Sequence, residues 1–278
     1  MEAEEVKKST NSHIKRLSSA LIGFPIIAII LVIGNKYMIS VGLAIIAILA
    51  MHEYLHAVSK KSKPVKWISY LSCALISLLS LVTQYMYSNI ILISLLMIVL
   101  LLFLQVILTG MKTNFNDIIY TLMGIIYIAF FIGSMAMVRN LENGRILIWY
   151  IIFAGWATDV FAYSIGRRFG KHKFSEVSPK KSIEGCIAGT LGAVIVILIY
   201  TYCLNLYASV EYSYLMAAII ALVLSIIGQI GDFAASTIKR YVEIKDYSNL
   251  IPGHGGMLDR IDSLMFIAPF AYILLQLL

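Results

Sequence analysis

The chain has 278 residues, of which 60% are hydrophobic and 13% charged, and its formal net charge is +7. Soluble globular domains carry about 25% charged residues, so this composition excludes an ordinary soluble domain. Several apolar runs reach the length of about 20 residues that a helix needs to cross the hydrocarbon core of a bilayer. These runs are continuously apolar and do not alternate, so we expect helices and not the strands of a barrel.

About nine transmembrane helices are predicted, which makes the fold class an all-α polytopic membrane protein. The charged N-terminal segment leads into a long apolar run without an A-x-A cleavage site. We therefore interpret this run as a retained first helix and not as a removed signal peptide. The expected spans are 17–34, 37–57, 67–87, 89–109, 117–138, 146–165, 186–204, 212–230 and 262–278.

The lysine and arginine residues predict the orientation, because cytoplasmic loops are enriched in them. With a cytoplasmic N-terminus, 19 of the 22 basic residues face the cytoplasm, and only Lys36, Arg139 and Arg145 face the other side. An odd number of spans then places the C-terminus outside. Membrane topology thus accounts for the positive charge, and we expect no nucleic acid partner.

Two polar segments on the predicted cytoplasmic side, 166–185 and 231–262, carry many ionisable groups and glycines. Ionisable groups gathered against the ends of membrane helices indicate a functional site. We therefore divide the chain into two parts. Residues 1–145 form an N-terminal transmembrane part for lipid contact and assembly, and residues 146–278 form a catalytic transmembrane part that contains both loops.

The second segment holds four of the six aspartates of the chain, Asp232, Asp246, Asp259 and Asp262. Asp232 shares a helical face with Ser236 and Lys239, and Asp259 shares one with Asp262 if the last helix begins nearby. Between these pairs, the sequence PGHGG at 252–256 predicts a turn whose backbone can approach a ligand closely.

Carboxylates and a hydroxyl with little imidazole or thiol suit a hard cation such as Mg²⁺. Four unneutralised carboxylates so close in sequence would repel one another, and bound cations would relieve that repulsion. The neighbouring basic residues could instead pair with the carboxylates, although that alternative does not explain the glycine-rich turn. These basic residues are Lys239, Arg240, Lys245 and Arg260.

The segment from Ser236 to Asp262 resembles the signature of the phosphatidate cytidylyltransferases, S-x-x-K-R-x-x-x-x-K-D followed by P-G-H-G-G-x-x-D-R-x-D. The segment from Asp159 to Gly185 is similar to two further stretches of that family, D-x-x-A-Y-x-x-G-R-x-x-G-K and S-P-K-K-S-x-E-G. The resemblance is close from Asp159 to Leu264. The first 145 residues are similar only in being a run of hydrophobic helices.

This resemblance implies transfer of a cytidylyl group from CTP to phosphatidic acid, with Mg²⁺ and room for a second cation. It further implies a homodimer in the cell membrane whose active site opens to the cytoplasm. Catalytic roles are expected for Asp232, Asp246, Asp259, Asp262, Lys239, Arg240 and Lys245, and metal binding for the same four aspartates with Ser236. Substrate binding is expected for Ser178, Lys180, Lys181, Ser182, Gly253, His254, Gly255, Gly256, Arg260, Asp159, Tyr163 and Arg167.

Other motifs give three alternatives. His52-Glu53-Tyr54-Leu55-His56 is an H-E-x-x-H sequence, which on a helix can bind zinc as in metalloproteases. The sequence from Gly166 to Lys171 is one residue short of a phosphate-binding P-loop. Asp159, near the end of a span, could mark an ion pathway, but no inverted repeat typical of transporters is visible. The three cysteines lie in apolar runs and form no metal or disulfide pattern.

Overall fold

The computed structural model describes residues 29–79, 81, 84–175, 178–179, 181–208, 211–251 and 255–278, with the side chains of 84–90 excepted. About 80% of the structure is helix, and the described residues form no strand. Two isolated antiparallel bridges, Lys173 with Ser182 and Ile251 with Gly255, close two of the loops. The expected all-α class is confirmed.

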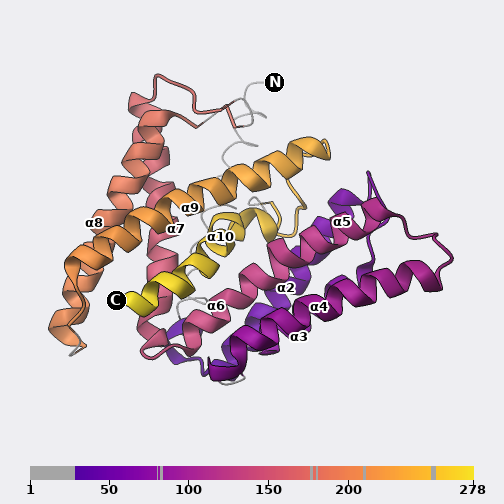
Figure 1. Ribbon diagram of the computed structural model, residues 1–278. Coiled ribbons are helices and arrows are strands. Elements are labelled where there is room, and N and C mark those ends of the chain that lie inside the picture. The colour runs from indigo at the N-terminus through magenta and orange to yellow at the C-terminus, as the bar shows by residue number, and fades with distance from the viewer. Residues whose placement is uncertain are drawn as a thin grey trace. The chain divides into compact units, whose positions relative to one another are not determined.

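The helices follow one another in the order shown by the labels in Figure 1, and the longer connections are 170–182 and 242–257. Residues 29–33 are helical. They are followed by α2 (Lys36–Val58), α3 (Lys66–Leu79), α4 (Gln84–Leu108), α5 (Phe115–Gly124), the π-helix η1 (Ile125–Phe130), α6 (Phe131–Asn140), α7 (Gly144–Phe169), α8 (Ile183–Tyr207), α9 (Tyr214–Tyr241), α10 (Leu258–Leu274) and the 3₁₀ turn η2 (Leu275–Leu277).

Among the described residues, six helices are long and apolar enough to cross a membrane. They are Lys36–Val58, Ile91–Leu108, Phe115–Asn140, Gly144–Phe169, Ile183–Tyr207 and Tyr214–Tyr241, and Lys66–Leu79 is a shorter apolar helix. The chain is therefore a multi-pass membrane protein. The predicted first span lies mostly outside the described residues.

Two of the predicted boundaries are wrong. The span expected at 67–87 ends at Leu79, and the next helix already begins at Gln84. The polar segment expected from residue 231 is helical as far as Tyr241, so the loop before α10 is only 242–257. The sequence Ser-Leu-Val-Thr at 80–83 contains no charge, glycine or proline to mark the first boundary, and charged residues such as Lys239 do not end a helix by themselves.

The structure divides into two compact units. Unit 1 contains residues up to Ala129 together with Val242–Ile261, and unit 2 contains Phe130–Tyr241 and Asp262–Leu278. In unit 1, α2 packs mainly on α3, and both contact α5. The loop 242–257 and the start of α10 therefore belong with the N-terminal helices. The functional division at residue 145 stays a prediction.

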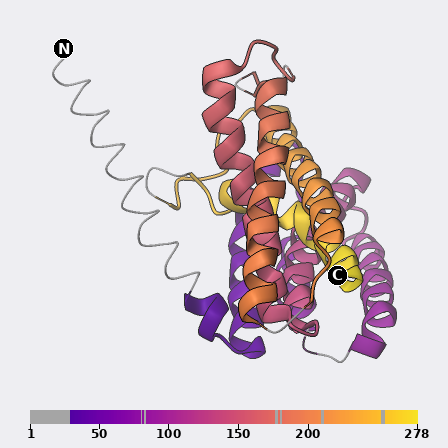
Figure 2. The same cartoon turned by 90° about the vertical axis from the view of Figure 1, so that its left-hand side faces the viewer.

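In unit 2, α7 packs most extensively on α8, and α8 packs on α9. Figures 1 and 2 both show α7 and α8 side by side, joined at one end by the loop 170–182. Close approach depends on small residues: a Cβ added at Gly189 of α8 would lie 2.7 Å from the carbonyl oxygen of Thr158 in α7. Small residues at helix contacts are typical of membrane proteins, because they let backbones meet.

Hydrogen bonds between side chains link the same three helices. The Thr158 hydroxyl lies 2.6 Å from the Ser225 hydroxyl, and the Ser225 hydroxyl lies 3.3 Å from that of Thr190. Gln229 Nε2 also donates to Thr190 Oγ1 at 2.9 Å and to the Cys186 carbonyl at 3.2 Å. These contacts fix the register of α7, α8 and α9, which together carry the first group of predicted site residues.

Candidate active site

The loop between α7 and α8 is closed like a hairpin and holds Lys181 in place. The Phe174 N–H donates to the Lys181 carbonyl at 3.0 Å, and the Ile183 N–H donates to the His172 carbonyl at 3.0 Å. The Glu184 carboxylate lies 2.6 Å from His172 Nδ1 and accepts from the His172 backbone N–H at 3.3 Å. Lys181 therefore lies on a loop whose ends are held together by hydrogen bonds.

A cavity of about 530 Å³ lies beside this loop in unit 2. Six of the predicted substrate-binding residues line it, and they come from α7 and from the loop that leads into α8. Asp232 of α9, predicted to be catalytic, lines it as well. The six are Asp159, Tyr163, Arg167, Ser178, Lys181 and Ser182. The structure thus gathers two separate sequence motifs around one polar space.

An ion pair lies at this cavity. The Lys181 ammonium forms an ion pair with the Asp232 carboxylate, and both side chains are about three-quarters buried. The same ammonium lies 4.3 Å from the centre of the Phe233 ring, a cation–π contact. Asp262 of α10 interacts electrostatically with Asp232, Lys239 and Asp159. Three carboxylates and two ammonium groups therefore share one neighbourhood of unit 2.

Two predicted residues of the cavity have contacts with other protein groups. The Ser182 hydroxyl accepts from the Gly185 N–H at 3.1 Å, so this serine caps the N-terminus of α8. Arg167 Nη1 donates to the Tyr163 hydroxyl at 3.3 Å. These contacts give Ser182 a structural role and hold Arg167 near the cavity.

The second group of predicted residues lies in unit 1, around Gly255. Asp259 Oδ2 accepts from the Tyr247 N–H at 2.8 Å and from the Gly256 N–H at 3.1 Å. A Cβ added at Gly255 would lie 3.3 Å from Asp259 Oδ2 and 3.7 Å from Asp246 Oδ1. Gly255 also has a φ of 84°, which favours glycine. The two aspartates therefore flank one glycine.

Glu53 of α2 is a residue of this group that the sequence analysis did not assign to it. Its carboxylate accepts from the Met257 and Leu258 N–H groups at 2.9 and 2.8 Å, and from the Ser248 hydroxyl at 2.5 Å. Leu258 is the first residue of α10, whose N-terminus attracts negative charge. Glu53 is 4% exposed. An acid inside an apolar helix was the signal that could have pointed to such a role.

The hydrogen bonds of Glu53 argue against zinc binding by the H-E-x-x-H sequence. The Glu53 carboxylate is engaged by backbone N–H groups, and His52 Nδ1 lies 2.9 Å from the Tyr70 hydroxyl. In the part of the chain that the structure describes, no group of three or more histidine, cysteine, aspartate or glutamate side chains is placed to hold a metal ion. Glu53 is an anchor for the start of α10.

The remaining predicted residues do not line the 530 Å³ cavity. Ser236, Lys239 and Arg240 lie on the last turns of α9, Lys245 lies in the loop, and Arg260 lies on the first turn of α10. Lys180, Gly253 and His254 lie outside the described residues. Which of these residues bind substrate or metal stays a prediction.

The fold and the two groups of residues define a class: a multi-pass helical membrane protein with clustered carboxylate and basic side chains that suit phosphate chemistry. Comparison with known proteins makes this class specific. A family model described as "Cytidylyltransferase family" matches residues 14–278. The chain belongs to the cytidylyltransferase family.

Three relatives illustrate the similarity, and each is named phosphatidate cytidylyltransferase. The Bacillus subtilis (strain 168) protein is 37% identical over 181 residues, which cover 64% of this chain and 66% of that protein. The Staphylococcus haemolyticus (strain JCSC1435) protein is 36% identical, with coverages of 68% and 70%. The Staphylococcus aureus (strain COL) protein is 38% identical, with coverages of 59% and 61%. The chain thus covers between 61% and 70% of the length of these relatives.

Proposed function

We propose that this protein is a phosphatidate cytidylyltransferase, which transfers a cytidylyl group from CTP to phosphatidic acid and releases pyrophosphate. The product is CDP-diacylglycerol, an intermediate of phospholipid biosynthesis. The observation that carries this proposal is the 530 Å³ cavity, because six residues of two sequence motifs meet there beside the Lys181–Asp232 pair. The names of the relatives support the same activity.

The chemistry asks for positioning and charge stabilisation more than for a strong base. An oxygen of the phosphatidate phosphate attacks the α-phosphorus of CTP, and the bond to the pyrophosphate oxygen breaks. A phosphate monoester has a second pKa near 6, so the nucleophile is already largely ionised at neutral pH. The barrier lies in bringing two polyanions together, which cationic side chains lower. Lys181 and Arg167 lie at the cavity for this task.

Mg²⁺ is the proposed cofactor, together with a second cation. The support is the type of donor atom, oxygen, and not a group of ligands already assembled among the described residues. Asp232 and Asp262 of unit 2 interact electrostatically, and Asp246 and Asp259 of unit 1 flank Gly255. All four offer the oxygen ligands that Mg²⁺ prefers, and Ser236 adds a hydroxyl. Bound Mg²⁺ would neutralise negative charge on the phosphates of CTP.

We further propose nine membrane spans with a cytoplasmic N-terminus and an external C-terminus, in the cell membrane. The distribution of basic residues supports this orientation. It would open the active site to the cytoplasm, where CTP is found, and leave phosphatidate in the adjoining leaflet. A homodimer is also proposed, on the resemblance alone.

The direct test is to supply the purified protein in detergent or liposomes with CTP, Mg²⁺ and phosphatidate. We expect CDP-diacylglycerol and pyrophosphate in equal amounts, and neither product with ATP in place of CTP or with excess chelator. A parallel reaction with diether phosphatidate identifies the lipid backbone that the enzyme prefers. Folded protein that yields no CDP-lipid from either lipid would contradict the proposal.

A further inference from the structure

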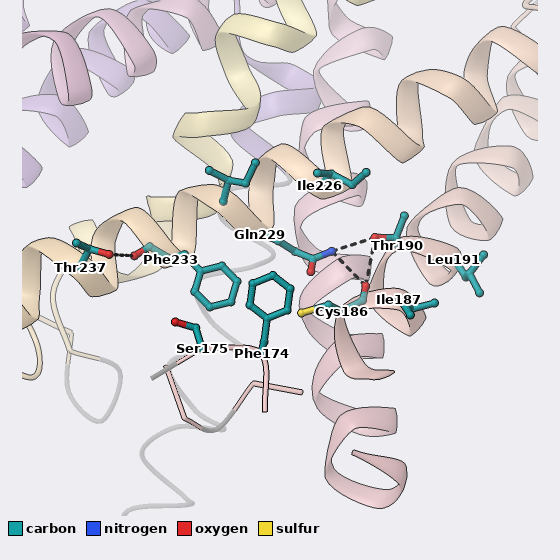
Figure 3. Close-up of a pocket in the computed structure, with 11 residues that line it drawn as sticks. Phe174, Ser175, Cys186, Ile187, Thr190, Leu191, Ile226, Gln229, Phe233 and Thr237 are labelled. Atoms are coloured by element: carbon teal, nitrogen blue, oxygen red, sulfur yellow. Dashed lines mark hydrogen bonds between the residues drawn. The ribbon is translucent and has the colours of Figure 1, made fainter. Parts of the chain in front are cut away.

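A second cavity, of about 600 Å³, lies in unit 2 and shares two lining residues with the polar one. Figure 3 shows the residues that line it. We call it the apolar groove. Its walls come from α8, α9 and the loop before α8. The lining residues are Phe174, Ser175, Cys186, Ile187, Thr190, Leu191, Ile226, Gln229, Ile230, Phe233 and Thr237. Its volume is in the range of about 300–1,000 Å³ that ligand sites occupy.

The outer wall of the apolar groove is made of side chains that the protein leaves uncovered. Ile187 and Leu191 of α8 are 58% and 59% exposed, and Ile226 and Ile230 of α9 are 46% and 53% exposed. Both helices are long and apolar enough to cross a membrane. Exposed apolar side chains on such helices face hydrocarbon, so the groove opens toward lipid chains and not toward water.

The inner end of the apolar groove meets the polar cavity. Cys186 and Gln229 line both spaces. Phe233 follows Asp232 on α9, and its ring stacks on Phe174 with 4.7 Å between centroids. Figure 3 shows these two rings facing each other beside Gln229. Since the Lys181 ammonium lies over the Phe233 ring, the charged group and the apolar lining are separated by one aromatic side chain.

Several polar groups of the groove already form hydrogen bonds within the protein. Gln229 Nε2 donates to Thr190 Oγ1 and to the Cys186 carbonyl, and Thr237 Oγ1 donates to the Phe233 carbonyl at 2.8 Å. A bound cytosine ring would need protein donors and acceptors that form hydrogen bonds with the polar edge of the base, whereas a hydrocarbon chain needs none. The lining therefore favours a hydrocarbon ligand over a nucleotide base.

We propose that the apolar groove holds an acyl chain of the phosphatidate substrate, with the lipid phosphate beside Lys181 in the polar cavity. This inference rests on the proposed function and deepens it, because it states where one part of the lipid substrate binds. The phosphate meets the ammonium group, the chain passes the Phe174–Phe233 pair, and its far end lies between Leu191 and Ile226.

The test compares tryptophan substitutions inside and outside the groove. Ile226→Trp and Leu191→Trp should fill it, and Leu222→Trp and Ile195→Trp are matched controls. Each control lies one turn from its partner on the same helix, does not line the groove, and is similarly exposed, at 46% and 55%. The substrates are dioleoyl phosphatidate in mixed micelles and soluble dihexanoyl phosphatidate, with KM and kcat measured for each and for CTP.

We expect the groove variants to raise the KM for dioleoyl phosphatidate roughly tenfold, the scale on which apolar pockets respond to small changes of shape. The KM values for dihexanoyl phosphatidate and CTP should change less than twofold, and the controls should resemble the unaltered protein. An unchanged ratio of the two lipid KM values, whether both stay the same or both rise equally, would overturn the proposal. A rise in the KM for CTP alone would also overturn it.

A second measurement uses the unaltered protein and needs no turnover. Phosphatidate with a diazirine at the end of one acyl chain is photolysed in liposomes, and labelled peptides are mapped. Labelling within 187–191 and 226–233 that excess dioleoyl phosphatidate suppresses would support the proposal. Labelling confined to other helices, or cross-linking of this face to a second copy of the chain, would refute it. Failure of the proposed function would instead appear as absence of CDP-lipid from every phosphatidate tested.

Discussion

At the scale of single residues, the four motif aspartates have different surroundings. Asp232 pairs with Lys181, whereas Asp259 accepts two backbone N–H groups and is 9% exposed. Asp262 is 8% exposed and accepts from the Ser263 N–H at 2.8 Å. An Asp→Asn substitution keeps the size of the side chain and removes its charge. At Asp232 it therefore tests the role of the charge in the reaction, whereas at Asp259 and Asp262 it tests the local structure as well.

The first prediction is that Asp→Asn changes at Asp232, Asp246, Asp259 and Asp262 each lower kcat by about 10²–10³, the usual cost of losing one electrostatic partner in a preorganised site. Steady-state assays across Mg²⁺ concentrations measure this effect. Near-normal rates at saturating Mg²⁺ in all four variants would show that these carboxylates do not hold the metal.

Glu243 provides the matched control for this series. It lies in the same segment, and its carboxylate pairs with Lys61 at 3.1 Å while remaining 79% exposed. Exposed ion pairs contribute about 0–1 kcal/mol, so Glu243→Gln should retain nearly full activity. A loss equal to that of the aspartate variants would mean that the segment responds to any lost charge.

The second prediction concerns Glu53. In Glu53→Gln, the new NH₂ group must face an N–H or hydroxyl donor, so one buried donor loses its acceptor. We expect a loss of about 1–3 kcal/mol in the free energy of unfolding, measured by thermal unfolding in detergent. His52→Ala and His56→Ala, on the exposed side of α2, should change stability and cytidylyl transfer little. Stoichiometric zinc that is lost in the two histidine variants would contradict this interpretation.

Lys181 and Glu53 differ in how far the sequence alone could predict their surroundings. The loop motif predicted Lys181 as a substrate-binding residue, and the structure places it at the cavity with five other residues predicted in the same way. Glu53 belongs to the H-E-x-x-H sequence, for which zinc binding was one alternative. Its partners are backbone N–H groups about 200 residues away, and a single sequence carries no pattern that pairs a carboxylate with a distant backbone.

At the scale of elements, hydropathy located the interiors of the helices better than their ends. The spans expected at 37–57 and 146–165 correspond to Lys36–Val58 and Gly144–Phe169. The end of α9 was missed because its last turns, from Gly231 to Tyr241, are polar yet still helical. Membrane helices continue past the hydrocarbon wherever local hydrogen bonding permits it, so apolar length is a lower limit on helix length.

The third prediction tests the close contact of α7 and α8. A Cβ at Gly189 would meet the Thr158 carbonyl oxygen at 2.7 Å and the Ala162 Cβ at 3.0 Å, so Gly189→Ala must separate the helices. We expect a loss of about 1–3 kcal/mol in the free energy of unfolding, the usual cost of overpacking. Thermal unfolding in detergent measures this loss.

Gly42 of α2 is the control for this substitution, because a Cβ there would meet no atom within 4 Å. Gly42→Ala should stabilise the protein by about 0.5–1 kcal/mol, since alanine loses less backbone entropy in a helix. Equal effects of the two substitutions would mean that helix propensity, and not the α7–α8 contact, decides the outcome at Gly189.

At the scale of the whole molecule, the fourth prediction concerns the proposed orientation. In a background without Cys73, Cys186 and Cys203, Lys173→Cys in the α7–α8 loop should resist impermeant thiol reagents in intact cells. Glu142→Cys, in the loop before α7, should react, because basic residues predict that its side faces outward. Labelling in the reverse order would contradict the orientation and the access of CTP from the cytoplasm.

The division into units was not predicted from the sequence. Hydropathy treats residues 242–261 as a connection between two membrane helices, and the motif assigns them to the catalytic part. In the structure they fold with unit 1, where Glu53, Asp246 and Asp259 determine their local contacts. Long-range contacts of this kind depend on tertiary packing, which neither charge counts nor periodicity reports.

The hydrogen bonds of Glu53 limit how this protein can be recombined with its relatives. A chimera that joins the N-terminal helices of another protein to residues 130–278 of this chain inherits the N–H groups of Met257 and Leu258 but not the carboxylate that they donate to. Such a hybrid will fold well only if the incoming helix carries an acid at the same place. Crossovers within this family should therefore keep that acid together with the start of α10, although about 200 residues of sequence separate them.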